Sequence, residues 1–206
     1  MPAAPIALPA ADQRSAEILD RARLAFAEKG FDGASMQDLA RATGMSVGNF
    51  YRYFPSKAAI VEAIITGDLA EIEQDFAAIL EATCPMDRLR ETIRARVRDD
   101  HCSGKGQLWA EITAAALRKP EIGIVANRME RVVAGYLITV FARTKGISLD
   151  AAARRYDAHA GLIMMMVRAS AVQGATPGEA RDQLTNLILR TIDQCLDEIS
   201  SDADEA

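Results

Sequence analysis

The sequence predicts an all-α fold. Apolar residues recur at the three- and four-residue spacing of a helix through most of the 206 residues. No segment shows the sustained alternation of apolar and polar residues, bounded by turn residues, that is typical of strands. Glycine and proline lie between the periodic stretches and divide them into separate helices. No internal repeat is visible, and the length suits one large domain or a small domain joined to a larger one.

The first two helices are marked by the residues at their ends. An apolar stripe runs through the first helix, and Gly30 follows it in the position of a C-terminal cap glycine. Ser35 begins the second helix and forms, with Asp38 three residues later, a capping-box pattern. The stripe of the first helix consists of Ile18, Ala22, Ala25 and Phe26.

A turn over residues 44–46 leads to a short third helix over residues 47–54. Ser46 is placed to cap this helix, and Pro55 ends it because proline disfavours helical geometry in the residue before it. Projection at about 100° per residue gives the helix a buried and an exposed side. The buried side is expected to hold Val47, Phe50 and Phe54, with Tyr51 at its margin, and the opposite side Gly48, Asn49, Arg52 and Tyr53.

Two helices joined by a tight turn, the second with an exposed polar and aromatic face, form the helix-turn-helix pattern of DNA-binding proteins. Gly48 lets the helix approach the floor of a groove, and Asn49 offers the donor and acceptor that the adenine edge requires. Tyr51, Tyr53 and Lys57 can bind phosphates. The ordinary alternatives are a capping role alone for Ser35, relief of crowding for Gly48 and a solvated surface position for Lys57.

The rest of the chain divides into six further helices. Residues 1–13 contain three prolines and are expected to form a disordered leader, while residues 201–206 form a frayed acidic tail. The expected helices cover residues 56–82 and, approximately, residues 86–101, 106–119, 121–144, 149–173 and 177–199.

The distribution of charge permits a nucleic-acid partner. The net charge is −5, which argues weakly against one for the chain as a whole. Residues 1–57, however, carry seven Lys and Arg against six Asp and Glu (+1), and residues 58–206 carry 17 against 23 (−6). No apolar run approaches the roughly 18–20 residues that cross a bilayer, and the N-terminus lacks the basic region of a secretory signal. A cytoplasmic protein without a membrane partner is expected.

The sequence contains no pattern typical of catalysis or of metal binding. Cys84, Cys102 and Cys195 are odd in number and form no CxxC pair, which argues against a disulfide framework or a zinc site. No Ser/His/Asp set, HExxH or phosphate-binding glycine loop is present. The only dense titratable cluster is Asp99-Asp100-His101, beside a predicted helix end. We therefore expect no enzyme, no cofactor and no metal.

A longer signature covers residues 18–64 without a gap. Its elements are F-x-x-x-G-F, S-M-x-D-L-A, G-M-S-x-G-x-F-Y-x-Y-F and the S-K pair that opens the next helix. In these elements the chain resembles the N-terminal domain of the TetR (tetracycline repressor) family of bacterial transcriptional regulators. At position 47 this chain has valine, where many members have a polar residue. Hydrogen-bond reading of bases is therefore left mainly to Asn49. The resemblance implies phosphate contacts at Ser35, Tyr51, Tyr53 and Lys57, and base contacts at Val47, Gly48 and Asn49 with Tyr53 contributing in some members.

The resemblance also implies a division of labour between residues 14–62, which bind DNA, and residues 63–200, which form a helical ligand-binding and dimerisation domain. The last two helices are apolar over more than one face, as expected if they bury against a second copy. Their predicted interface residues are Tyr156, Ala160, Ile163, Val167, Leu184, Ile188 and Thr191. The predicted pocket residues, each of which can instead be plain core, are Phe76, Trp109, Met129, Tyr136, Met164 and Met165. Residues that either orient the polar end of a ligand or serve as surface residues or internal ion-pair partners are His101, Glu111, His159 and Arg168.

The sequence therefore predicts a DNA-binding transcriptional regulator. In the first hypothesis a homodimer represses from a near-palindromic site in double-stranded DNA and is released by a small apolar or amphipathic effector. In the second, the helical body of a DNA-binding regulator is controlled by a protein partner instead of a small molecule. An all-α enzyme is the third, and no motif supports it.

Overall fold

The computed structural model describes residues 10–98, 103–172 and 178–202. Within these ranges the chain forms nine α-helices and no strand, which confirms the all-α fold. The helices are α1 (Ala10–Gly33), α2 (Met36–Ala42), α3 (Val47–Tyr53), α4 (Lys57–Glu81), α5 (Pro85–Arg98), α6 (Ser103–Ala116), α7 (Pro120–Lys145), α8 (Leu149–Val172) and α9 (Glu179–Ser201).

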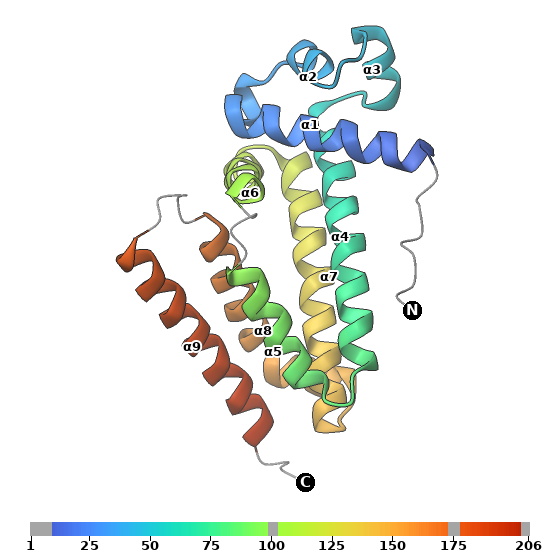
Figure 1. Ribbon diagram of the computed structural model, residues 1–206. Coiled ribbons are helices and arrows are strands. Elements are labelled where there is room, and N and C mark those ends of the chain that lie inside the picture. Colours follow the sequence, from blue (N-terminus) through green and yellow to red (C-terminus); the bar gives the residue numbers. More distant parts are fainter. Residues whose placement is uncertain (1–9, 99–102, 173–177, 203–206) are drawn as a thin grey trace, which may run out of the picture.

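The helices form a small head and a longer body. In the head, α1 lies across one end of the molecule with α2 and α3 beyond it (Figure 1). In the body, α4 and α7 run side by side away from α1, and α6 lies against α1. α5 and α8 pack against α7, and α9 contacts α5 and α8 as the outermost helix. We use "head" for α1–α3 and "body" for α4–α9.

Local side-chain chemistry fixes the helix starts in and beside the head. The hydroxyl oxygens of Ser35, Ser46 and Ser56 each accept a hydrogen bond from the backbone N–H three residues later, at 3.1, 3.3 and 3.2 Å. These bonds satisfy N–H groups that have no partner within the helix. Gly30 has φ 73° and ψ 161°, so the regular part of α1 breaks at the glycine where the sequence predicted its end.

Some expected boundaries are wrong by a few residues. α1 begins at Ala10, so residues 10–13 are helical rather than part of a disordered leader; residues 1–9 lie outside the described chain. α6 starts and ends earlier than expected, and α7 begins at Pro120, the first helical position, where a missing N–H costs no hydrogen bond. α9 continues to Ser201, the first residue assigned to the tail, and residues 203–206 are not described.

The buried residues form two clusters. The body cluster lies between α4, α5, α7, α8 and α9. The junction cluster contains head residues such as Phe26 and Phe50 together with Leu108 and Ile112 of α6 and Ile122 of α7. The head therefore shares its core with the body instead of enclosing one of its own.

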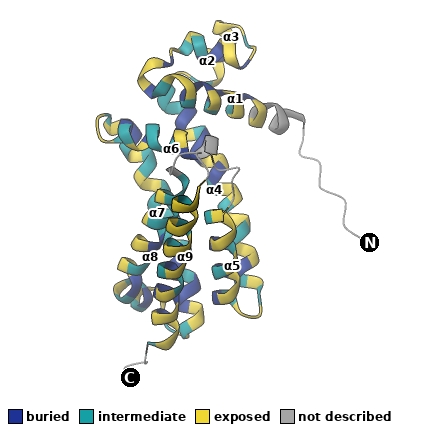
Figure 2. Cartoon of the chain, turned by 60° about the vertical axis from the view of Figure 1, so that its left-hand side comes forward, coloured by how far each residue is buried: buried dark blue, intermediate teal, exposed yellow. Residues whose placement is uncertain are grey.

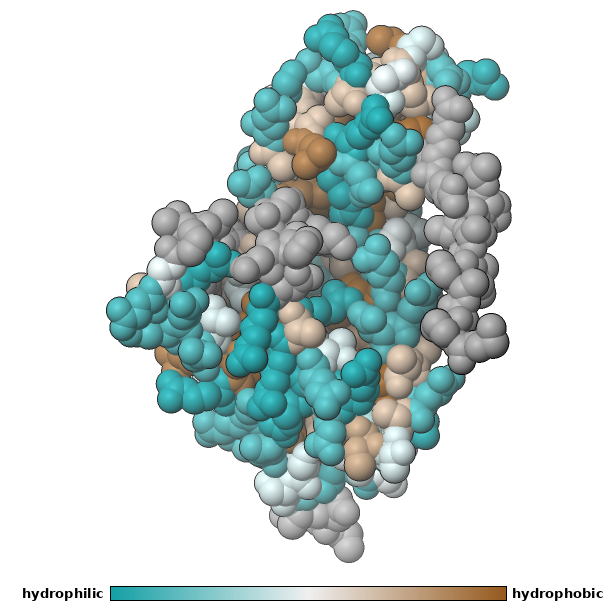
Figure 3. All heavy atoms as spheres, in the orientation of Figure 1, coloured by the Kyte–Doolittle hydropathy of each residue, from teal (hydrophilic) through white to brown (hydrophobic). Residues whose placement is uncertain are grey.

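Within the described residues, no single helix is long and apolar enough to cross a membrane. The pair Pro120–Lys145 and Leu149–Ala171 passes the length and composition test only when taken together, with a bend of 117° between them. On the face seen in Figure 3, hydrophobic residues appear as small separate patches in a largely hydrophilic surface.

Candidate nucleic-acid interface

The third helix is held by one buried residue and is otherwise open to solvent. Phe50 is completely buried in the junction cluster, and its ring centroid lies 5.4 Å from that of Phe54. Among the residues of α3, only Phe50 is buried, and Figure 2 shows this helix largely exposed at the end of the head. α3 is thus attached to the core through Phe50 at its centre, and the rest of the helix faces solvent.

The position of Val47 corrects the helix projection. Val47 was expected on the buried side, but 41% of its surface is exposed. It lies one turn before Phe50, in the first turn of a seven-residue helix, and the hydrophobic neighbours that cover Phe50 do not extend over that turn. Tyr53 is 58% exposed, which confirms its expected outward position, whereas Tyr51, expected at the margin of the buried side, is 47% exposed and thus more open than Val47.

Five predicted DNA-contact residues of α3 are exposed to solvent. No side-chain hydrogen bond of Asn49 is found among the described residues, so its amide is available to an external partner. We call this set the reading surface, and it consists of Val47, Gly48, Asn49, Tyr51 and Tyr53.

Gly48 is not required by packing. A Cβ atom added at Gly48 would meet no other atom within 4 Å, which excludes the interpretation that this glycine relieves crowding. A glycine inside a helix costs about 0.5–1 kcal/mol relative to alanine. Packing within the described chain therefore does not account for the glycine.

Ser35 has the capping role that the sequence predicted. Its hydroxyl accepts from the Asp38 N–H at 3.1 Å, and the Asp38 carboxylate accepts from the Ser35 N–H at 3.1 Å, which completes the capping box. Lys29 Nζ binds the other carboxylate oxygen at 2.7 Å. This lysine and then the Ser35 groups hold the pKa of Asp38 well below its usual range. A phosphate contact by Ser35 stays a prediction beside this established cap.

Lys57 is turned towards the end of α1. Its ammonium donates to the carbonyl oxygens of Phe31 at 2.6 Å and Asp32 at 3.2 Å, and lies 4.8 Å from the centroid of the Phe31 ring. Partial burial lowers the pKa of Lys57. An ammonium has three N–H donors, so one remains for a phosphate. Lys57 is therefore not a plain solvated lysine, whatever it does on DNA.

Lys57→Met is expected to lower the free energy of unfolding by about 1–2 kcal/mol, because two carbonyls lose a charged donor. If Lys57 also binds a phosphate, the slope of log K against log salt should decrease by about 0.9 for each head. Thermal unfolding and a salt titration of DNA binding measure the two effects. Arg143→Met, an equal change of charge at an exposed site on α7, is the control. A salt slope equal to that of the control would restrict Lys57 to its structural role.

The predicted pocket residues do not converge on one site. The rings of Phe76 and Tyr136 stack at 5.2 Å, and Met164 packs with them against the body cluster. Trp109 and Met129 instead pack against the junction cluster. Met165 is wrong as a pocket residue, since 68% of its surface is exposed. Side-chain size indicated that these residues pack, but not against which neighbours.

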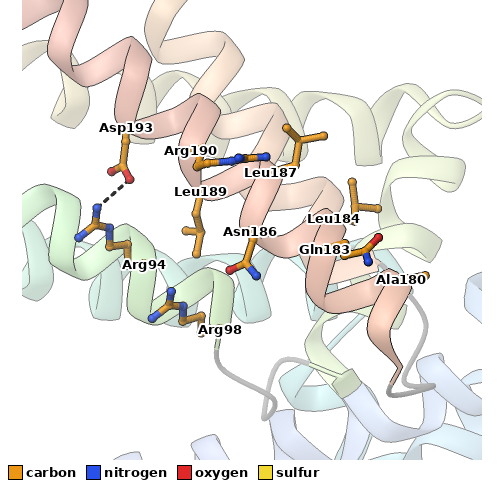
Figure 4. A pocket seen from close by; sticks show the side chains of 10 residues that line it. All are labelled: Arg94, Arg98, Ala180, Gln183, Leu184, Asn186, Leu187, Leu189, Arg190 and Asp193. Atoms are coloured by element: carbon orange, nitrogen blue, oxygen red, sulfur yellow. Dashed lines mark hydrogen bonds and ion pairs between the residues drawn. The ribbon is translucent and has the colours of Figure 1, made fainter.

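A groove of about 920 Å³ lies elsewhere, between α5 and the first half of α9 (Figure 4). Arg94 reaches Asp193 at 2.7 Å across it, while Arg98 and Arg190 have no ion-pair partner among the described residues. Three leucines of α9 also line the groove: Leu184, Leu187 and Leu189. Its lining is therefore both cationic and apolar, and it includes none of the six predicted pocket residues.

Three of the predicted dimer-interface residues are wrong. Tyr156, Ala160 and Ile163 are buried in the body cluster of their own chain, so they cannot face a second copy. Their stripe showed which side of α8 is buried but not which helix covers it. Val167, Ile188 and Thr191 are partly buried, and Leu184 is exposed. The exposed large apolar residues in the described parts of α8 and α9 are Leu149 at the start of α8, Leu162, Met165, Leu184 and Leu187.

The polar candidates of the body have partners inside the protein. Glu111 accepts a hydrogen bond from the Phe31 N–H at 2.9 Å, and Arg168 pairs with Glu130 at 2.6 Å. His159 Nε2 lies 3.7 Å from a Glu198 carboxylate oxygen. His101, with the rest of Asp99-Asp100-His101 and Cys102, lies outside the described residues. In the described part of the chain, no three His, Cys, Asp or Glu side chains are grouped to hold a metal.

Two contacts between distant residues have no signal in the sequence. Arg23 of α1 binds both carboxylate oxygens of Asp68 in α4, at 3.1 and 2.7 Å. The bond from Phe31 to Glu111 likewise joins residues 80 positions apart. Neither pair has a characteristic spacing, so only the fold identifies them.

The head is similar in sequence to known bacterial regulators. Residues 18–64 match the family model described as bacterial regulatory proteins, tetR family. The chain is 28% identical over 120 residues to the HTH-type transcriptional regulator UidR of Escherichia coli (strain K12), which covers 58% of this chain and 60% of UidR. It is 30% identical over 80 residues to the HTH-type transcriptional repressor KstR2 of Mycobacterium tuberculosis (strain ATCC 25618 / H37Rv), covering 38% and 40%. The chain thus spans less than two thirds of these curated relatives.

Solved structures extend the likeness to the body. Salmonella enterica GusR aligns with a TM-score of 0.70 and 26% identity, over 92% of this chain and 98% of GusR. AibR in complex with isovaleryl coenzyme A and operator DNA aligns with a TM-score of 0.62 and 18% identity, over 87% and 97%. The second likeness concerns the fold alone. Through the signature in residues 18–64, the chain carries the N-terminal domain of the bacterial regulatory proteins of the tetR family, as the sequence predicted.

Proposed function

We propose that this protein is a DNA-binding transcriptional regulator that reads the major groove with α3. The observation that supports this most is the reading surface, which projects from the head on a helix anchored by Phe50 alone. A helix of this kind enters a major groove with the residues of its first turns against the base edges. Val47, Gly48 and Asn49 occupy those turns.

The residues of the reading surface divide into base and phosphate contacts. Asn49 can donate to and accept from adenine, and Val47 can touch a thymine methyl group. Tyr51 and Tyr53 can donate their hydroxyls to phosphates on either side. Ser35 and Lys57 complete the proposed phosphate contacts, Lys57 with the one donor that the α1 carbonyls leave unused.

The protein is proposed to act as a homodimer on a near-palindromic site. The support is the exposed apolar side of α8 and α9, where Leu162, Met165, Leu184 and Leu187 have no cover in the single chain. Large exposed apolar residues on neighbouring helices are typical of an interaction surface, and symmetric dimers are the commonest assembly. Two heads related by a two-fold axis would bind two half-sites about one helical turn of DNA apart.

Control by a small apolar or amphipathic effector, and repression as the outcome, complete the proposal. AibR, a protein of the same fold, has been solved with isovaleryl coenzyme A and operator DNA. In this chain the groove between α5 and α9 places Leu189 beside Arg98 and Arg190, which have no ion-pair partner among the described residues, and this lining suits an amphipathic molecule. Such an effector acts by favouring a spacing of the heads that does not fit the operator.

Selection of genomic fragments by the purified protein at two salt concentrations tests the proposal. We expect one near-palindromic sequence to be enriched and to remain enriched at the higher salt, because base contacts add to the salt-dependent phosphate term. Enrichment that disappears at higher salt without a shared sequence would contradict specific regulation. Operator recovery together with no stabilisation by any small molecule would favour control by a protein partner.

Asn49→Ala is expected to weaken binding to the selected operator by about 1–3 kcal/mol and to relax the preference at one base pair in each half-site. Random DNA should be bound as before, since phosphate contacts are intact. Fluorescence anisotropy with a set of single-base operator variants measures both effects. Asn127→Ala, the same change at an exposed site on α7, is the control. Equal losses on operator and random DNA would contradict base reading by Asn49.

A further inference from the structure

The head is attached to the body by polar contacts at two points of α1. Near its middle, the Arg23 guanidinium binds both carboxylate oxygens of Asp68 in α4 and lies 3.4 Å from the Ile64 carbonyl oxygen. At its C-terminal end, the Phe31 N–H donates to the Glu111 carboxylate in α6 at 2.9 Å. α1 thus bridges two body helices, one at each attachment.

The second attachment is closely fitted. Gly30, with φ 73°, exposes its backbone to the Glu111 side chain, and a Cβ there would lie 3.2 Å from the nearer carboxylate oxygen. The carboxylate can therefore sit directly against the break in α1, where the Phe31 N–H has left the regular helix. Apolar residues on the same helix, Leu108 and Ile112, are fully buried in the junction cluster and fix the position from which Glu111 reaches out.

Neighbouring charges hold the same end of α1. Asp32 pairs with Arg118 at 3.0 Å and with Lys119 at 3.1 Å, both at the turn that follows α6. These two cations hold the pKa of Asp32 below its usual range. Lys57 donates to the Phe31 and Asp32 carbonyls from the start of α4. The exposed pairs with Asp32 contribute little, because solvent screens them. Glu111 provides the charged acceptor that is part-buried.

We propose that Glu111 is a positioning residue for DNA reading, because its carboxylate fixes the end of α1 to α6 and thereby sets the orientation of the reading surface relative to the body. With the middle of α1 held to α4 by Arg23, loss of the Glu111 contact leaves the C-terminal end of α1, and with it α2 and α3, less firmly oriented relative to α6. The role in DNA reading rests on the proposed function, whereas the mechanical role depends only on the contacts described above.

The test compares Glu111→Ala and Glu111→Gln with wild type and with a matched control. Glu111→Gln keeps an uncharged oxygen acceptor and should therefore retain part of the effect. The control is Glu62→Ala, which removes another interhelical acidic residue, 3.6 Å from Arg128, whose side chain makes no hydrogen bond or ion pair with α1 among the described residues. Far-UV circular dichroism establishes that each variant is folded, and Glu111→Gln carries the test if Glu111→Ala is not.

Three measurements on the full chain give separate answers. Hydrogen exchange at Phe31 should become about 10- to 100-fold faster in Glu111→Ala, since a hydrogen bond to a charged group is lost. The distance between nitroxide labels at Arg52 in the head and Arg143 in the body reports the orientation of the head. The labels are placed in a background with the native cysteines replaced, and labelled protein is diluted with unlabelled protein. Glu111→Ala should give a broader distribution of this distance than wild type. The dissociation constant for the selected operator should rise about tenfold, with that for random DNA within about twofold. Glu111→Gln should fall between wild type and Glu111→Ala, and Glu62→Ala should match wild type.

Unchanged Phe31 exchange, or an unchanged distance distribution, in Glu111→Ala would overturn the positioning role. Faster exchange and a broader distribution with an unchanged operator constant would also overturn it, since Glu111 would then be only a helix cap. If wild type itself shows no operator preference, the proposed function fails, and the exchange and distance measurements still decide whether Glu111 orients the head.

Discussion

Phe50→Ala is expected to lower the free energy of unfolding by about 3–5 kcal/mol, because removal of a buried aromatic ring loses its burial and leaves a cavity. Phe50 is the residue by which α3 reaches the core, and it is completely buried. A helix of seven residues has little stability of its own, so without this anchor α3 should no longer hold its geometry. Specific DNA binding should be lost with it.

Thermal unfolding followed by circular dichroism measures the change, at about 2–4 °C of Tm for each kcal/mol in a chain of this size. Tyr53→Ala is the control, because it removes a ring of similar size that is 58% exposed. It should leave stability within about 0.5 kcal/mol of wild type. A Phe50→Ala protein with wild-type Tm would mean that α3 is held by other contacts.

Asp68→Leu is expected to lower the free energy of unfolding by about 3–5 kcal/mol, because it leaves the part-buried guanidinium of Arg23 without the Asp68 carboxylate. Asp68 is 6% exposed, and the Arg23 side chain is 14% exposed. The remaining carboxylate, that of Asp20, lies 3.7 Å from the Arg23 Nε without a hydrogen bond and is 76% exposed, so solvent screening leaves it a weak substitute. The Ile64 carbonyl oxygen, at 3.4 Å, would be the nearest remaining acceptor.

The double variant Arg23→Met/Asp68→Leu separates the loss of a pair from the isolation of a charge. Replacing both members of a buried ion pair by apolar residues of similar volume is often neutral or stabilising. We therefore expect the double variant to recover most of the stability that Asp68→Leu loses, in urea unfolding of both proteins. Equal losses in the single and double variants would show that the isolated arginine is not the cause.

The sequence predicted those features whose causes are local. Ser35 and Ser46 cap the helices they were expected to cap, and Gly30 breaks α1, because each acts on backbone groups within a few residues. The reading surface was found for the same reason, except at Val47. Periodicity gives the direction of a side chain, but the extent of the neighbouring surface decides whether it is covered.

Features that depend on distant neighbours were not predictable. Tyr156 and Ile163 were assigned to an interface with a second copy, and they pack within their own chain because an apolar stripe does not identify the surface that covers it. Glu111 was considered for a ligand, and its partner is a backbone N–H at the end of a helix 80 residues earlier. No pattern in the sequence distinguishes Arg23 or Asp68 from the other charged residues of the predicted helices.

The open space around Gly48 has an evolutionary consequence. A side chain gained at Gly48 would meet nothing in the folded protein, so selection for folding does not act against most substitutions there. Val47 and Asn49 are similarly exposed, whereas Phe50, between them and the core, is fully constrained. Under the proposed function, single mutations at these positions would change the target sequence with little effect on the stability of the fold.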